Sequence, residues 1–304
     1  MKINLIDQKK NFSNNFGAIY RTSAMFYIPK NINTFVCISN YWEFKNNVKV
    51  GIVITIRHLN GKLFSREEKN FNESNVLVIS NFGIDEGSVE IEAFSNQNLK
   101  IPYAAVMGVY EAKKSINMVH TYARNHSLIE LEENNVITQA KESCWTIKPE
   151  FENKAIFHNG HLKTKKQVAK IILTNQNGKE STKIFKIKEL KPFETFIFDL
   201  KKIYPNLKKF LLNKNGFATL HFKNNSSFTR LLLIWSKNRN EEFQSTHSNF
   251  DYSKYLTNKV KTKKGGEMSI PKLPDYIKNF QLIVYPKFEK GEYFYDFNGG
   301  RKNF

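Results

Sequence analysis

The chain has 304 residues, enough for two domains of ordinary size that bury their own cores without disulfides or structural metals. Its 47 Lys and Arg residues outnumber its 28 Asp and Glu residues, giving a formal net charge of +19. With two cysteines, Cys37 and Cys144, a disulfide framework is not expected, and a reducing compartment fits. The sequence shows neither a signal-peptide core nor a long apolar run, so we expect a cytoplasmic protein without a membrane span.

The basic composition has two interpretations. Clustered Lys and Arg residues would indicate a surface for nucleic acid, an anionic polysaccharide or a membrane. The lysines are instead spread along most of the second half, and Lys, Asn, Ile and Phe are abundant together, which is typical of a compositional bias over the whole chain. A solvated basic surface therefore explains the charge more simply than a functional anion-binding role, and both interpretations stay open.

Short strands with alternating apolar residues fill the first half of the chain. Ala24–Ile28 and Thr34–Ser39 alternate on either side of a Pro-Lys-Asn turn, and Val48–His58 follows. The charged run Ser65–Lys69 is expected on the exposed face of a neighbouring strand. Because strands recur at short intervals and no long segment keeps a helical period, this pattern predicts antiparallel sheets packed as a sandwich.

The second half repeats this pattern with one exception. An acidic connector, Ser127–Lys141, precedes a strand at Cys144–Ile147. The segment Asp199–Asn213 places apolar residues at helical spacing around Pro205, which predicts a short helix capping an open end of a sandwich. A basic linker, Lys259–Glu267, then leads to an aromatic C-terminal extension that either adds a strand to the sandwich or docks elsewhere.

Two stretches, Gly87–Arg124 and Gly216–Asp251, read as copies of each other. In both, Gly precedes an alternating run, a longer apolar strand follows, and a short polar strand then carries one histidine. Upstream, Val50–Lys62 and Gln167–Lys179 each close a strand with an Asn-Gly pair, the strongest short hairpin signal. A chance match between two β-sandwich halves is the alternative to a true repeat.

The sequence thus predicts an all-β protein of two tandem β-sandwich domains, Ig-like or jelly-roll-like, related by internal duplication. We expect the first sandwich in residues 1–140 and the second, with its short helix, in residues 141–257. The basic linker and the C-terminal extension occupy residues 258–304.

The matched histidines, His120 and His247, are the main candidates for a functional site. If the two copies pack about a pseudo-two-fold axis, both would face one shared cleft with Arg124, His126 and Asp251. Imidazole and carboxylate groups there would bind a metal or transfer protons near neutral pH. The alternative, which we favour, is that each histidine hydrogen-bonds its own hairpin, so neither a metal nor a cofactor is predicted.

Aromatic side chains supply further candidates for ligand binding. Trp42 and Tyr122 are expected at strand ends or turns, where a sugar ring or a base would stack on them. The sequence does not separate this role from a Phe-rich core.

These observations favour a non-catalytic binding or assembly protein whose ligand is anionic, either a polysaccharide or a partner protein; nucleic acid is a less favoured partner. The alternative is an enzyme that uses the paired histidines in the interdomain cleft, with a metal or as acid–base groups. No catalytic motif is present to decide between them.

Overall fold

The structure is a computed structural model, and it describes residues 20–39, 50–69, 75–95, 106–121, 140–224, 230–248, 250–251, 294–297 and 300–303. The chain divides into two compact units, Met1–Phe250 and Asp251–Phe304, which we treat separately. Both sandwiches belong to the first unit. The predicted boundaries after residues 140 and 257 stay predictions.

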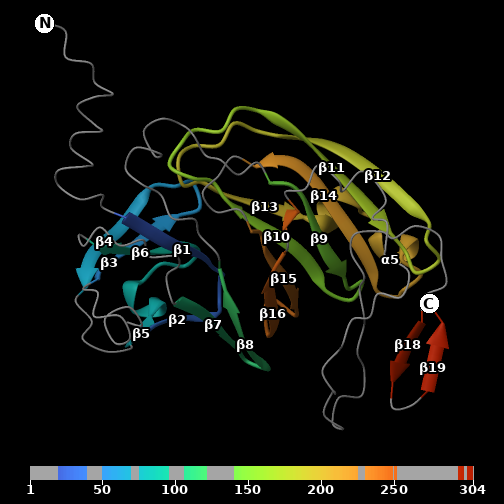
Figure 1. Cartoon of the computed structure of the whole chain (residues 1–304), viewed down its shortest axis with the longest axis horizontal. Coiled ribbons are helices and arrows are strands. Elements are labelled where there is room, and N and C mark those ends of the chain that lie inside the picture. The colour runs from blue at the N-terminus through green and yellow to red at the C-terminus, as the bar shows by residue number, and fades with distance from the viewer. Residues whose placement is uncertain are drawn as a thin grey trace, which may run out of the picture. The chain divides into compact units, whose positions relative to one another are not determined.

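The first sandwich is built from eight strands in two antiparallel sheets (Figure 1). Sheet A has the order β1-β6-β3-β4 and sheet B the order β5-β2-β7-β8. A 3-10 helix, η1 (Ile79–Phe82), follows β5. The strands are β1 (Tyr20–Ile28), β2 (Asn33–Ile38), β3 (Gly51–His58), β4 (Leu63–Lys69), β5 (Asn75–Val78), β6 (Gly87–Ser95), β7 (Val106–Ala112) and β8 (Ser115–His120).

The second sandwich repeats this order strand for strand. Sheet C has the order β9-β14-β11-β12, with β17 beside β9, and sheet D has the order β13-β10-β15-β16. The strands are β9 (Ala140–Ile147), β10 (Glu152–His158), β11 (Gln167–Thr174), β12 (Glu180–Ile187), β13 (Thr195–Asp199), β14 (Gly216–Asn224), β15 (Leu232–Lys237), β16 (Glu242–His247) and β17 (Phe250–Asp251). The predicted all-β sandwich fold is confirmed.

The two sandwiches also share their strand register. Gly87 of β6 lies opposite Ile28 of β1, and Gly216 of β14 lies opposite Ile147 of β9. Both Asn-Gly pairs form the predicted hairpin turns, because Gly61 and Gly178 adopt positive φ angles of 82° and 74°. Descent of the two halves from one duplicated unit stays a prediction that this shared register supports.

Alternation along the strands sends one face of each sheet into a core. In β3, for example, Ile52, Ile54 and Ile56 are buried in the core of the first sandwich. Sheet D differs because it is buried on both faces. Ala155 and Leu233 pack into the second core, whereas Ile156 and Leu232, and other side chains of the opposite face, pack with the first core.

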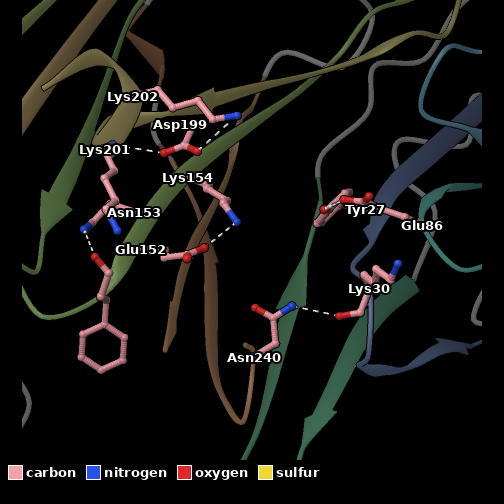
Figure 2. A network of polar contacts seen from close by, with 11 residues as sticks. Tyr27, Lys30, Glu86, Glu152, Asn153, Lys154, Asp199, Lys201, Lys202 and Asn240 are labelled. Atoms are coloured by element: carbon pink, nitrogen blue, oxygen red, sulfur yellow. Dashed lines mark hydrogen bonds and ion pairs between the residues drawn. The ribbon is translucent and has the colours of Figure 1, made fainter. Parts of the chain in front are cut away.

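The predicted helix between β13 and β14 is two helices of four residues each, α4 (Leu200–Ile203) and α5 (Leu207–Phe210). The break falls at Pro205, because the residue before a proline is pushed out of the helical region, and Tyr204 has φ −124° and ψ 82°. The carboxylate of Asp199 caps α4 by accepting a hydrogen bond from Lys201 N (Figure 2). The prediction of a single helix was therefore wrong in its continuity.

The turn between β3 and β4 contacts the loop before β13, so the two sandwiches are joined near this point. Thr195 N donates to Leu59 O at 2.8 Å. A Cβ added to Gly61 would lie 2.3 Å from Pro192 O, so the two backbones touch here. Elsewhere, the side chain of Asn240 donates to Lys30 O (Figure 2).

In the second compact unit, β18 (Phe294–Phe297) and β19 (Gly300–Asn303) pair as a two-stranded antiparallel sheet. The predicted basic linker, Lys259–Glu267, lies outside the described residues. In the part of the chain that the structure describes, no helix has the length and apolar character needed to cross a membrane.

Candidate functional site

The edge strands β8 and β16, one from each sandwich, lie next to each other. Side chains rather than a backbone ladder join them. Ser115 Oγ donates to Phe243 O and accepts from Phe243 N, both at 2.8 Å, and Asn117 Nδ2 donates to Phe243 O at 2.7 Å. Ser245 Oγ also donates to Asn117 Oδ1. Polar side chains of one edge thus satisfy the unpaired backbone groups of the other.

Phe243 anchors this contact. Its side chain is buried in the core of the first sandwich, and its ring centroid lies 5.2 Å from that of Tyr110. Tyr110 is held in turn by its hydroxyl, which donates to Tyr27 O at 2.8 Å. An aromatic side chain with its backbone bonded by Ser115 and Asn117 fixes the relative position of β8 and β16.

His120 and His247 occupy the same register position in their sandwiches. His120 pairs with Met107 of β7, and His247 pairs with the equivalent residue, Leu232 of β15. Because β8 and β16 are neighbours, the two imidazole rings meet edge to face, with centroids 4.5 Å apart and planes at 73°. His120 is exposed and His247 is half-buried.

A third basic group, Arg230, completes this cluster. Its Nη1 lies 3.3 Å from Nε2 and 3.5 Å from Nδ1 of His247. The Nδ1 atom is also 3.2 Å from Ser248 O, which accepts a hydrogen bond when Nδ1 carries the proton. Nε2 is then the acceptor for Arg230. We call His120, His247 and Arg230 the histidine junction.

The junction discourages protonation of His247. Burial lowers its pKa most, the Arg230 and His120 charges lower it further, and the hydrogen bond to Ser248 O works in the opposite direction. His247 is therefore a neutral imidazole over a wider pH range than a free histidine. Its position is fixed because Ser248 N donates to Leu231 O at 2.9 Å and Ser248 Oγ accepts from Leu231 N at 3.2 Å.

The junction is rich in potential positive charge and poor in metal ligands. Nowhere in the described residues do three or more His, Cys, Asp or Glu side chains gather in a way that could hold a metal ion. Two imidazoles alone fall short of the three or four ligands that zinc takes from a protein. The arrangement is suited to holding an anion, and the imidazole pair is also suited to proton transfer.

Of the other predicted site residues, Trp42, Tyr122, Arg124 and His126 lie outside the described residues. Asp251 belongs to β17, the strand beside β9, and only its backbone is described. Of the predicted site residues, the structure therefore shows two in contact, His120 and His247.

Sequence reasoning missed Arg230 as a member of the site. A signal for it existed, because in the hairpin formed by β15 and β16 Leu232 pairs with His247, and Arg230 lies two residues before Leu232. A basic residue directly before the buried strand is thus placed at the level of the histidine.

His158 has a structural role. His158, at the end of β10, is buried, and its Nδ1 lies 3.0 Å from Thr195 Oγ1. The neighbouring Asn159 donates to Leu162 O at 2.8 Å and to Lys191 O at 2.7 Å, so this segment is a hydrogen-bonded turn. These bonds explain why the segment that follows β10 turns at Asn159.

Comparisons with known proteins place the chain in no family. No protein-family model matches it, and no curated protein matches its sequence. Among solved structures, it is aligned with Bacteroides uniformis beta-glucuronidase 2 covalently bound to cyclophellitol-6-carboxylate aziridine, at 9% identity and a TM-score of 0.16. The alignment covers 76% of this chain and 26% of that enzyme. A similarity this low supports no conclusion about fold or function.

Proposed function

We propose that the chain is a non-catalytic binding or assembly protein, and that it holds an anionic ligand at the histidine junction. The observation that carries this proposal is the meeting of His120, His247 and Arg230 at the contact between the two sandwiches. The ligand is an acidic polysaccharide or an acidic segment of a partner protein.

The physical reason is that three basic side chains meet at the junction. Arg230 is always charged, and an anion beside His247 would favour protonation of its imidazole. A carboxylate or sulfate group bound there would accept charge-assisted hydrogen bonds from up to three side chains. The formal net charge of +19 would also steer polyanions toward the protein at low ionic strength.

The position of the junction supports a binding role. His120 comes from one sandwich, while His247 and Arg230 come from the other, so a ligand held by all three would bridge two parts of the fold. Ser248, Ser115 and Asn117 already fix β8 and β16, which means that little conformational entropy is lost on binding.

An enzyme is the second candidate, and the observation that favours it is the neutral imidazole of His247 beside His120. Because burial lowers its pKa, His247 is unprotonated near neutral pH and is available as a general base. A substrate turned over by the protein, with the turnover lost in His247→Gln, would favour this candidate over binding.

The test is binding of a heparin-derived hexasaccharide, followed by isothermal titration and by NMR of the histidine side chains. We expect Arg230→Gln and His120→Gln each to weaken binding at least about tenfold, the loss of one charge-assisted hydrogen bond. The matched control is Arg239→Gln, which removes an exposed arginine from the turn between β15 and β16.

Two outcomes would contradict the proposal. In the first, the hexasaccharide binds wild type and Arg230→Gln equally, which would assign its affinity to the diffuse basic surface. In the second, the NMR signals of His120 and His247 do not respond to ligand at any pH. Binding should fall steeply with salt whether the hexasaccharide binds at the junction or on the diffuse basic surface, so salt dependence does not distinguish these two sites.

A further inference from the structure

The outer face of sheet B, which is the face turned away from the first core, is apolar. Two rows of directly paired residues cross its four strands. The first row is Val78, Phe35, Val109 and Met118, and the second is Val76, Cys37, Met107 and His120. We call these two rows the sheet B face. Val76 is 55% exposed and Met118 61% exposed, and Ile116, two residues before Met118 in β8, is 69% exposed.

Such a face is unusual for an antiparallel sheet of this kind, whose solvent side is normally polar. Scattered exposed apolar residues need no explanation, but a contiguous apolar surface indicates an interaction site. The described residues of β2, β5, β7 and β8 place neither Lys nor Arg on this face, although 47 of the 304 residues of the chain are Lys or Arg. Among the described residues of these four strands, the one carboxylate is that of Glu111, in the neighbouring row opposite Ile116.

The equivalent face of sheet D, in the second sandwich, is buried. Its second row is Ile197, Ile156, Leu232 and His247, in the same register as Val76, Cys37, Met107 and His120. There, Ile156 and Leu232 are fully buried and pack with the core of the first sandwich. The same face is therefore an interface in the second sandwich and is apolar but accessible in the first.

We propose that the sheet B face is a docking surface for the sheet B face of a second copy of this chain, so that the protein forms a two-fold symmetric dimer. Identical four-stranded faces pack on each other at the spacing of sheets in a sandwich, about 10 Å. A two-fold axis makes such a contact self-complementary, because each residue meets its counterpart in the other copy.

Charge favours a second copy over other occupants. Apart from His120 at its edge, which belongs to the histidine junction, the described part of this face has no basic side chain to hold a nucleic acid, an acidic polysaccharide or a membrane surface. Two copies that each carry a formal +19 repel one another, and a contact free of lysine is where that repulsion is smallest. The contact would also continue an interface that the fold already makes, because β8 borders both the sheet B face and β16.

Sedimentation equilibrium over a concentration series tests the proposal, with Met118→Lys as the disrupting variant. The matched control is Ile184→Lys, which places the same charge at an exposed apolar residue of β12 in the second sandwich. We expect dimers for wild type and Ile184→Lys, and for Met118→Lys a dissociation constant raised at least about tenfold, since two charges enter one apolar contact. A circular dichroism spectrum like that of wild type would show that Met118→Lys still folds.

Cys37 supplies a second measurement, because it lies in the middle of the sheet B face as a free thiol. Its alkylation by a maleimide, followed by mass spectrometry of its own peptide, should slow as wild-type protein is concentrated and should not slow in Met118→Lys. A wild type that is monomeric at all concentrations would overturn the proposal. If the protein is monomeric and Cys37 still resists alkylation, another part of the same chain covers the sheet B face. That result would also overturn the proposal of a dimer.

Discussion

Gly61 of the first sandwich lies against Pro192 of the second, so closely that a Cβ on Gly61 would be 2.3 Å from the carbonyl oxygen of Pro192. Gly178 occupies the same place in the Asn-Gly turn of the second sandwich, and a Cβ there would meet no atom within 4 Å. Both glycines have positive φ, so both carry the same backbone requirement. They differ in their surroundings, because Gly61 lies at a contact between the two sandwiches and Gly178 does not.

Replacing each glycine by alanine therefore measures how much this contact contributes to the free energy of unfolding. Gly178→Ala should cost about 1 kcal/mol of unfolding free energy, since a non-glycine residue is disfavoured at positive φ. Gly61→Ala should cost clearly more, because the turn must also move away from Pro192 and thereby disturbs the hydrogen bond from Thr195 N to Leu59 O. Urea unfolding of both variants gives the comparison, and equal losses would show that the turn does not hold the two sandwiches together.

A second prediction concerns the aromatic anchor of the contact between β8 and β16. Phe243→Ala should destabilise the protein by about 3–5 kcal/mol, because it removes a buried ring from the core shared with Tyr110. The control is Ile116→Ala, at the equivalent position of β8, where the side chain is exposed and a loss below about 0.5 kcal/mol is expected. Similar effects of the two changes on the urea midpoint would contradict the assignment of Phe243 to the shared core.

Local patterns explain why much of the fold was predictable. Asn60-Gly61 and Asn177-Gly178 specify their turns through residues that tolerate positive φ, and the alternation in β3 sets which side chains enter the core. The run from Leu231 to Trp235 is apolar at every position, the pattern of a strand buried on both faces, as β15 is.

The contacts between the sandwiches were less accessible from sequence. The meeting of His120 with His247 depends on two edge strands becoming neighbours, and no local pattern encodes which edges meet. Arg230, by contrast, reaches His247 within the hairpin of β15 and β16, so its place follows from pairing inside one sandwich. The break between α4 and α5 had a local cause, since Pro205 restricts the residue before it, but the helical spacing of the apolar residues on both sides concealed it.

A third prediction concerns a buried ion pair in sheet A. Arg57 Nη1 lies 2.7 Å from Glu90 Oε2, both side chains are buried, and the guanidinium carbon sits 3.9 Å from the ring centroid of Phe193. Glu90→Gln leaves a buried guanidinium without its counter-charge and should cost about 3–5 kcal/mol of unfolding free energy.

The control for this change is Glu67→Gln, which breaks an exposed pair with Lys69 and should cost less than about 1 kcal/mol. Guanidinium chloride would screen charges, so urea is the suitable denaturant for both variants. A Glu90→Gln variant as stable as Glu67→Gln would mean that solvent or another group compensates Arg57.

The last prediction uses His158, whose pKa is lowered to about 3 by burial and, to a smaller extent, by the charge of Arg57. In the unfolded chain the same imidazole has its ordinary pKa near 6.5. Between these values the unfolded state binds a proton that the folded state rejects, so the stability present above pH 6.5 is lost progressively as the pH falls toward 3. His221, with a pKa lowered to about 4 by burial, adds a contribution of the same sign.

Urea midpoints measured from pH 7.5 to pH 4.5 should therefore fall more steeply for wild type than for His158→Gln. The variant loses stability at pH 7.5, because its side chain replaces an imidazole hydrogen-bonded to Thr195, but it carries no group that titrates at this place. His221→Gln should also flatten the profile, because the folded-state pKa of His221, about 4, lies below the whole of this pH range. If the profile of His158→Gln runs parallel to that of wild type, acid lability arises elsewhere in the chain, and the buried neutral imidazole does not couple protonation to unfolding.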